Sequence, residues 1–283
     1  MRTSERGRRR PSKNSGVERR PLLAERLPYL AAVRPPAVPG PVPAFEDRIE
    51  VATYNVHRWA GVTGGRRWLP ELASDVIGEL GSDVIGLQEV LRPFGSEDPL
   101  ERIADELQLY LAFVSTRPHR RGELGNAILS RWPMTGVFTL DLSVGRLERR
   151  SAIAAQFRGD SRSVAVVATH LGLVDRTRKQ QVRSLLAHPR LQGPTVLLGD
   201  MNAWRRCAAT RQLDREFTER HHNKEWPPTF PAARPILALD RVYARGARVS
   251  EMRTHSSRSA RRGSDHLPVV ATIELGNSAG AVD

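Results

Sequence analysis

Short apolar runs, each ending in a cluster of polar residues, make up the chain from Ile49 onward and limit the folds it can adopt. The runs are five to seven residues long and most are rich in Val, Ile and Ala, which predicts β-strands. The nine expected strands are Ile49–Asn55, Val84–Gln88, Leu109–Ser115, Asn126–Ser130, Ala152–Phe157, Val164–Thr169, Thr195–Gly199, Ala238–Tyr243 and Val269–Ile273.

Helical patterns lie between some of these strands. Apolar residues recur every three to four positions in Trp68–Leu80, Leu100–Leu107 and Arg176–Leu186, as they do along the buried face of a helix. Strands and helices do not alternate strictly, which argues against a doubly wound parallel sheet. With 283 residues, 40% of them hydrophobic, the chain can bury a sizeable core in an α/β fold.

The N-terminal segment has a different composition. Residues 1–44 contain eight of the twenty prolines and no sustained apolar period. We expect a disordered basic arm over 1–44, a catalytic domain over 45–276 and a short flexible tail over 277–283. No apolar stretch follows Arg8-Arg9-Arg10, so a cleavable export signal is not expected.

Charge and cysteine content narrow the class of protein. The net charge is +13; residues 1–48 carry +6 from eleven basic and five acidic residues, which leaves a modest +7 for the rest. This excess does not by itself indicate a nucleic-acid binder. No apolar run approaches the length of about 18 residues that a transmembrane helix requires. Cys207 is the only cysteine, which excludes an intramolecular disulfide.

These features lead to expectations about location and partners. We expect a cytoplasmic protein, at most peripheral to a membrane, since the single cysteine fits a reducing compartment. The basic arm would make weak contact with an anionic membrane or with nucleic acid. No obligate protein partner is expected.

Residues that bind cations or transfer protons stand where the apolar runs end. One such residue is most often a turn former, but six endings with these residue types are hard to explain by turn chemistry alone. Polar groups at strand ends meet at one rim of a sheet, where sites are usually built. The residues are Asn55 and His57, Gln88 and Glu89, His170, Asp200 and Asn202, Asp240 and Arg241, and Asp265 and His266.

The residue types suit phosphodiester hydrolysis. Carboxylates and carboxamides are hard oxygen ligands for Mg²⁺ or Mn²⁺, and no zinc spacing is present. Histidines move protons or stabilise negative charge. A cation, donors to phosphate oxygens and a carboxylate that orients water are the parts that such a reaction needs.

The order of seven strings resembles a known family: TYNVH, LQEV, GNAILSR, THLG, GDMN, LDRVY and SDHLP. From about Ile49 to Leu275 the chain resembles the endonuclease/exonuclease/phosphatase superfamily, which includes deoxyribonuclease I-like nucleases and sphingomyelinases. The resemblance implies a four-layer α/β/β/α sandwich of two mostly antiparallel sheets flanked by helices. GDMNAW, His170–Leu186 and Thr229–Tyr243 look most like the small bacterial metal-dependent hydrolases of the superfamily.

The resemblance also implies roles for single residues. Glu89 resembles the principal Mg²⁺ ligand, with Asn55 and Asp265 close to the cation or its waters. Asp200 resembles the residue that orients or deprotonates water, and Asn202 the one that holds it. His170 resembles the donor to a non-bridging oxygen, and Asp240 and His266 the carboxylate–histidine pair. Whether His266 acts as a general base or as an electrostatic clamp stays open.

Other positions have two readings. His57 stands where the nucleases commonly have Asp, and either contacts substrate or packs the rim. Arg241 either reaches a phosphate or is a solvated strand-end residue, and Asn126, in GNAILSR, is a candidate substrate contact. Glu123 is either the partner of His170 or a loop carboxylate. Trp204 either lines an apolar shelf with Phe230 and Pro231 beside the phosphate or is a packing residue.

The sequence therefore predicts a Mg²⁺-dependent phosphodiesterase that uses in-line attack of water, with Mn²⁺ as a substitute. No Ser, Cys or Thr lies in a nucleophile motif. A lipid or small-molecule phosphodiester is the expected substrate. The alternative is a DNA or RNA nuclease, for which the basic stretches Arg117–Arg121 and Arg253–Arg262 contain no aromatic residue. A non-catalytic phosphate-binding module is the third possibility.

Overall fold

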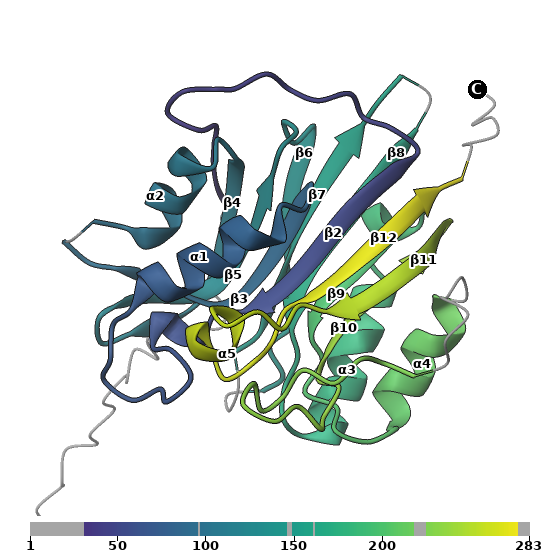
Figure 1. Ribbon diagram of the computed structural model, residues 1–283. Coiled ribbons are helices and arrows are strands. Elements are labelled where there is room, and N and C mark those ends of the chain that lie inside the picture. Colours follow the sequence, from purple (N-terminus) through teal and green to yellow (C-terminus); the bar gives the residue numbers. More distant parts are fainter. Residues whose placement is uncertain (1–30, 96, 146–148, 161, 218–224, 277–283) are drawn as a thin grey trace, which may run out of the picture.

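The computed structural model describes residues 31–95, 97–145, 149–160, 162–217 and 225–276. Two sheets lie face to face (Figure 1). The seven-stranded sheet runs in the order β1 (Ala31–Arg34), β4 (Tyr110–His119), β5 (Gly122–Ser130), β3 (Val84–Pro93), β2 (Arg48–Asn55), β12 (Val269–Leu275) and β11 (Ala247–Thr254). The five-stranded sheet runs in the order β10 (Asp240–Arg245), β9 (Thr195–Asp200), β8 (Ser163–His170), β7 (Ser151–Arg158) and β6 (Gly136–Asp141).

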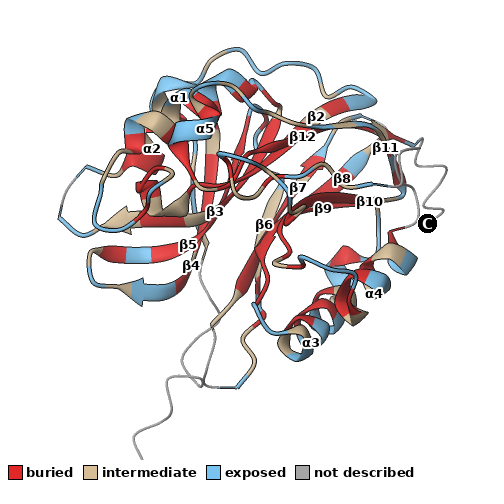
Figure 2. Ribbon diagram, turned by 60° about the horizontal axis from the view of Figure 1, so that its bottom comes forward, coloured by how far each residue is buried: buried red, intermediate tan, exposed pale blue. Residues whose placement is uncertain are grey.

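Helices cover the outer face of each sheet. The seven-stranded sheet packs against α1 (Pro70–Leu80), α2 (Pro99–Glu106) and the short α5 (Ala260–Gly263), which contribute Val76, Leu100, Ile103 and Ala260 to one apolar core. The five-stranded sheet packs against α3 (Asp175–Leu186) and α4 (Ala208–Glu216) through a second core. Two short 3₁₀ turns, η2 (His57–Trp59) and η3 (Pro189–Leu191), complete the assigned elements of the described chain. The buried side of each helix faces its sheet in Figure 2. The expected four-layer sandwich is confirmed.

Each sheet is antiparallel except for one parallel pair. β2 runs parallel to β3, and β8 runs parallel to β9. Parallel strands run toward the same edge of a sheet, so these two pairs bring the ends of β2, β8 and β9 to one rim. The expected strand end at Gln88 is wrong, because β3 continues to Pro93, and Gln88 lies within it opposite Asn55. The other pairings in both sheets are antiparallel.

The third core lies between the sheets and is rich in Val, Ile and Ala. Gly86 in β3 faces the other sheet at close range: a Cβ atom there would lie 2.1 Å from Leu198 Cδ1 and 3.1 Å from the Ala168 Cβ. Only a residue without a side chain fits between those two strands of the facing sheet.

All nine expected strands and the three expected helices are present, most with slightly shifted ends. The strands that the sequence pattern missed are β1, β6 and β11, and each is the edge strand of its sheet. Edge strands bury less of their surface, so their apolar pattern is weak, as in the mixed burial of β11. The pattern also missed α4, whose buried residues are Ala209, Thr210 and Leu213.

The expectation that no element forms before Phe45 is wrong for residues 31–34, which form β1 against β4. The Arg34 guanidinium donates to the Asp105 carboxylate at 2.6 Å, and lowers the pKa of that carboxyl. Further along, the Trp132 indole donates to the Pro43 carbonyl at 2.9 Å, and Phe45 packs edge-on against Trp132. The segment from residue 31 to residue 45 is therefore part of the folded domain. The rest of the expected arm, and the expected tail, lie outside the described residues.

Among the residues that the structure describes, no helix is long and apolar enough to cross a bilayer. The cytoplasmic location stays a prediction.

A shortened chain tests the role of the N-terminal strand. A chain that begins at Phe45 loses β1, the Arg34–Asp105 pair and the Trp132–Pro43 hydrogen bond. Since each such hydrogen bond contributes roughly 0.5–1.5 kcal/mol, we expect a free energy of unfolding at least about 1 kcal/mol below that of a chain beginning at Ala31. Thermal unfolding of the two shortened chains measures this. Equal unfolding temperatures would show that the segment adds nothing to stability.

A single methyl group tests the fit between the sheets. Gly86→Ala should lower the free energy of unfolding by about 1–3 kcal/mol, because the facing Leu198 must move. Gly193→Ala is the matched control, since a Cβ there meets no heavy atom within 4 Å. Urea denaturation measures both. A Gly86→Ala protein as stable as the control would mean that the sheets separate without cost.

Candidate active site

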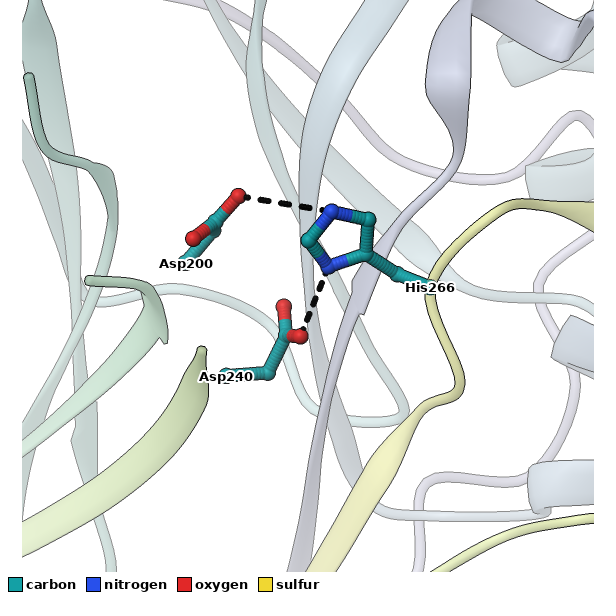
Figure 3. A group of neighbouring side chains, drawn as sticks. All are labelled: Asp200, Asp240 and His266. Carbon is teal, nitrogen blue, oxygen red and sulfur yellow. Dashed lines mark hydrogen bonds and ion pairs between the residues drawn. The ribbon is translucent and has the colours of Figure 1, made fainter. Parts of the chain in front are cut away.

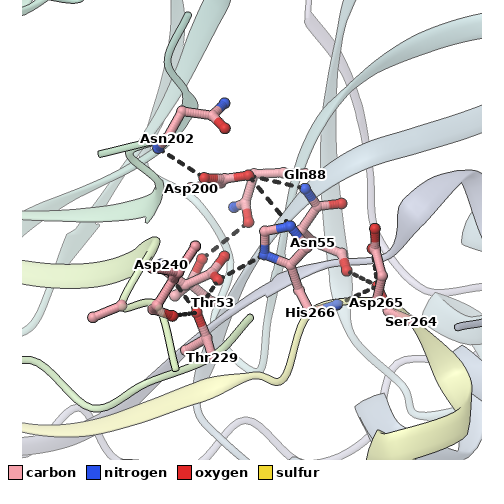
Figure 4. Close-up of polar contacts among 12 residues, drawn as sticks. Thr53, Asn55, Gln88, Asp200, Asn202, Thr229, Asp240, Ser264, Asp265 and His266 are labelled. Atoms are coloured by element: carbon pink, nitrogen blue, oxygen red, sulfur yellow. Dashed lines mark hydrogen bonds and ion pairs between the residues drawn. The ribbon is translucent and has the colours of Figure 1, made fainter. Parts of the chain in front are cut away.

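The polar strand ends meet at the rim where both parallel pairs finish. Asn55 at the end of β2 lies opposite Gln88 in β3, and His170 at the end of β8 lies opposite Asp200 at the end of β9. β10 runs antiparallel to β9, so its first residue, Asp240, also pairs with Asp200. Figure 4 shows the side chains of Asn55, Gln88, Asp200 and Asp240 gathered from both sheets.

The buried carboxylate of Asp200 is at the centre of this group. Its Oδ2 accepts a hydrogen bond from Asn55 Nδ2 at 3.1 Å, and its Oδ1 accepts one from the Asn202 backbone amide at 2.8 Å. Nε2 of His170 lies 3.4 Å from Oδ2, and Nε2 of His266 lies 3.8 Å from the same atom. One carboxylate thus connects the two sheets and faces both histidines.

The expected carboxylate–histidine pair is present in the structure (Figure 3). Nδ1 of His266 lies 2.8 Å from Oδ2 of the fully buried Asp240, and Thr229 Oγ1 donates to the same oxygen at 2.6 Å. Burial opposes protonation of His266, but Asp240, Asp200 and Asp265 raise its pKa to about 10. Asp240 therefore holds the imidazole in place. Without a bound metal, the ring is positively charged at neutral pH, with a proton on each nitrogen.

His170 has the opposite electrostatic environment. Burial lowers the pKa of its imidazole to about 3, against the attraction of Asp200, and Arg150 and Arg117 lower it further. The ring is therefore neutral at pH 7. A neutral histidine beside a charged one gives the site a hydrogen-bonding group next to a cation.

The three expected metal ligands come from adjoining segments of the rim. Glu89 occupies a bulge in β3 with φ of +52°, next to the Asn55–Gln88 pair, and its carboxylate lies 3.3 Å from Arg58 Nε. Ser264 donates to the Asn55 carbonyl at 2.7 Å, which places the adjoining Asp265 at the same point of the rim.

Two sets of side chains could hold a cation. Atoms of Asp200, Asp240 and His266 lie within 4.8 Å of one another. However, His266 and Asp240 already bind each other, which leaves the buried Asp200 carboxylate as the remaining donor of that set. Asn55, Glu89 and Asp265 offer oxygen atoms alone, the donor type that a hard cation such as Mg²⁺ prefers. The first set has the donor atoms that lie close together, and the second set has the donor type expected for Mg²⁺.

His57 holds the loop that follows β2. Its Nδ1 lies 3.1 Å from the Gly61 carbonyl and 3.2 Å from Asp265 Oδ1, and its backbone amide donates to Asn55 Oδ1 at 3.0 Å. A Cβ at Gly64 would lie 2.7 Å from the imidazole, so the ring is tightly enclosed. These contacts favour the interpretation that His57 packs the rim and positions Asp265.

Asn126 borders a small cavity beside the site. Its Nδ2 donates to the Ser151 carbonyl at 2.9 Å, and the cavity, of about 90 Å³, is also lined by Glu89, His170, Arg117 and Arg150. The cavity therefore presents two guanidinium groups to an anion. The sequence reading did not single out Arg150, and it noted Arg117 only as part of a basic stretch.

Three other expectations had mixed outcomes. Asn202 has φ of +49° and its side chain donates to the Leu171 carbonyl at 2.8 Å, beside Asp200. The Arg241 guanidinium donates to the Ala238 and Ala203 carbonyls, which favours a structural role over a phosphate contact. Glu123 as the partner of His170 is wrong: it is exposed and lines a separate pocket. Side chains alternate along a strand, so Glu123 points away from the face used by Asn126.

The three residues expected to line an apolar shelf lie in different surroundings. Phe230 lies against His266 with ring centroids 5.0 Å apart, and Pro231 follows it at half-buried exposure. Trp204 is 67% exposed, so its interpretation as a packing residue is wrong. The sequence analysis missed two residues of the site: Thr229, which holds Asp240, and Arg58, which faces Glu89. Thr229 begins a segment whose family resemblance was noted. Arg58 had no signal in the sequence.

Comparisons with known proteins identify the family. A model described as the Endonuclease/Exonuclease/phosphatase family matches residues 52–266. The uncharacterized protein YbhP of Escherichia coli K12 is 30% identical over 246 residues, which is 80% of this chain and 96% of YbhP.

Solved structures share the fold. An endonuclease/exonuclease/phosphatase from Beutenbergia cavernae aligns with a TM-score of 0.64 at 24% identity, covering 81% of this chain and 72% of that one. The human Nocturnin catalytic domain with bound sulfate aligns with a TM-score of 0.65 at 18% identity, covering 82% and 96%.

The two-sheet sandwich with an acid–histidine rim defines a class of hydrolases that includes nucleases, phosphodiesterases and phosphatases. The chain described here belongs to the endonuclease/exonuclease/phosphatase family.

The Asp240–His266 pair has a titration that can be measured. In EDTA, the His266 ring should stay protonated through pH 9, and in Asp240→Asn its pKa should fall, because burial then dominates. The pKa of His266 is higher in the folded state than in the unfolded state. Its ion pair with Asp240 therefore stabilises the fold fully below about pH 6.5, and this stabilisation is lost as the pH rises through about 10. NMR of labelled imidazoles, assigned with His266→Gln, measures the pKa. Titration near pH 6.5 in both proteins would contradict the ion pair.

Proposed function

We propose that this chain is a Mg²⁺-dependent phosphodiesterase that hydrolyses a lipid or small-molecule phosphodiester by in-line attack of water. The observation that carries the proposal is the position of the buried Asp200 carboxylate, which faces His170 and the Asp240–His266 pair from one side of the rim. Of the oxygen donors, Asn55 and Glu89 lie on the neighbouring strands β2 and β3, and Asp265 lies in the loop before β12. Acid, base and cation sites thus border one position for a phosphate.

Each residue has a chemical role in the proposed reaction. A cation held by Glu89, Asn55 and Asp265 would supply charge neutralisation at the phosphate. Asp200 orients the attacking water and accepts its proton, and Asn202, fixed next to it, holds the water in line. His170 hydrogen-bonds a non-bridging oxygen, and His266 stabilises the charge that develops on the phosphate. Asp240 and Thr229 orient the His266 ring.

Two features support an anionic substrate. The cavity beside Glu89 and His170 is lined by Arg117 and Arg150, whose planar guanidinium groups suit tetrahedral oxyanions. The Nocturnin catalytic domain, which shares the fold, holds a sulfate, an anion of the same shape as phosphate. Its activity is not carried over to this chain.

A nuclease is the second candidate, and one observation favours it. The β4–β5 hairpin carries Arg117, which lines the cavity, and Arg120 and Arg121 at its turn, and the Arg121 guanidinium lies 5.6 Å from the centre of the Trp68 ring. A basic strip next to an aromatic ring is a feature of sites for single-stranded nucleic acid. A panel of plasmid DNA, RNA, sphingomyelin, cardiolipin and cyclic nucleotides, each assayed with Mg²⁺ against Asp200→Asn, separates the substrate classes. Absence of any Asp200-dependent turnover would leave the non-catalytic phosphate-binding module.

The metal assignment has a matched control. Glu89→Gln should raise the Mg²⁺ concentration needed for half-maximal hydrolysis of bis(p-nitrophenyl) phosphate, because it removes a formal charge from the ligand set. Glu123→Gln changes the same residue type on the same sheet, outside the site, and should leave the titration unchanged. EDTA should abolish turnover in both. If Glu89→Gln keeps the wild-type Mg²⁺ dependence, Glu89 is a structural residue.

A further inference from the structure

Three loops next to the active site carry exposed apolar side chains. Leu173 and Val174, just after His170, are 67% and 58% exposed. Trp204, just after Asn202, is 67% exposed, and Ile236, just before Asp240, is 71% exposed. Among the described residues these are four of the nine large hydrophobic side chains that face solvent, and they come from the segments that hold the catalytic residues.

The three loops adjoin one another at one end of the five-stranded sheet. Their strands, β8, β9 and β10, are neighbours in the sheet. Arg205 Nη2 lies 3.3 Å from Asp175 and joins the first loop to the second. The Met201 amide donates to the Leu239 carbonyl at 2.9 Å, and Arg241 Nη2 donates to the Ala203 carbonyl at 2.8 Å, which join the second loop to the third. Figure 1 shows α3 and α4, which begin after the first two loops, side by side.

Each loop also carries an exposed arginine beside its apolar residue. Arg176 follows Leu173 and Val174, Arg205 and Arg206 follow Trp204, and Arg234 precedes Ile236. Aliphatic and tryptophan side chains interspersed with arginine are the composition of a surface that enters the headgroup region of a membrane. A surface for single-stranded nucleic acid would pair its arginines with several stacking aromatic rings, whereas Trp204 is the one aromatic ring here, among Leu, Val and Ile side chains.

We propose that this surface, formed by Leu173, Val174, Trp204 and Ile236 with their four arginines, docks on an anionic lipid bilayer. The apolar side chains enter the interface and the arginines contact lipid phosphates. Docking there holds the rim of Asp200 and His266 against the headgroups. This inference rests on the proposed phosphodiesterase function and selects, from its substrate classes, a lipid presented in a membrane.

Vesicle binding by the full chain tests the docking surface. We expect sedimentation with vesicles of phosphatidylcholine and phosphatidylglycerol, weaker binding to phosphatidylcholine alone, and partial loss at high salt. Leu173→Ser with Ile236→Ser should weaken binding by about tenfold or more, since two apolar side chains no longer leave water. Arg206→Gln should weaken it by about fivefold. Val38→Ser is the matched control, because Val38 is 70% exposed in the segment before β2, at the opposite end of the sandwich.

Tryptophan fluorescence reports where the contact occurs. Trp204 is exposed, whereas Trp59 and Trp132 are buried and Trp68 and Trp226 are half-buried. Anionic vesicles should therefore shift the emission to the blue, and Trp204→Phe should remove most of the shift while the protein still sediments with the vesicles. An equal shift in Trp204→Phe would overturn the proposed surface.

Two assays separate this inference from the proposed function. Leu173→Ser with Ile236→Ser should keep wild-type turnover of soluble bis(p-nitrophenyl) phosphate and lose turnover of lipid in vesicles. Wild-type turnover of the soluble diester without vesicle binding would overturn the docking surface and leave the function intact. Vesicle binding that needs these side chains, without turnover of any diester, would overturn the function alone. Binding to plasmid DNA through the same side chains, in place of vesicles, would assign the surface to nucleic acid.

Discussion

The Asp200 carboxylate is the interaction on which the site depends. It comes from the five-stranded sheet, accepts a hydrogen bond from Asn55 of the seven-stranded sheet, and faces two histidines from two further segments. A buried carboxylate needs such partners, because an unpaired charge away from water is costly. The same contacts that stabilise the charge therefore fix the distance between the two sheets at the rim.

Strand direction explains why these residues meet at all. In each sheet a single parallel pair interrupts an antiparallel order, and the two pairs end at the same rim. Backbone strain collects there too: of the six described non-glycine residues with positive φ, five are His57, Arg58, Trp59, Glu89 and Asn202. Such conformations cost about 1–3 kcal/mol each and persist where surrounding contacts hold them. Here they direct Glu89 and Asn202 toward the site.

The two histidines show how environment sets chemistry within one site. Both are buried and both face Asp200, yet burial keeps His170 neutral while Asp240 keeps His266 charged. The difference is a second carboxylate, held by Thr229 in contact with His266. Histidine thus supplies both a neutral hydrogen-bonding group and a cation beside the same Asp200 carboxylate. The exposed loops outside this rim add an apolar surface that the buried site lacks.

The sequence alone determined the elements whose signal is local. Alternating and continuous apolar runs predicted the central strands, and polar residues at their ends predicted which side chains gather, including Asp200, Asp240 and His266. Edge strands such as β1 and β11 escaped prediction because one side of an edge strand stays in solvent and leaves a weak pattern. Contacts between distant segments also had no local signal. The tertiary structure decided whether Glu123 or Arg150 faces His170. It also decided whether Arg241 points inward and whether Trp204 is buried. Strand register and loop packing set the direction of each of these side chains, and neither can be read from the local sequence.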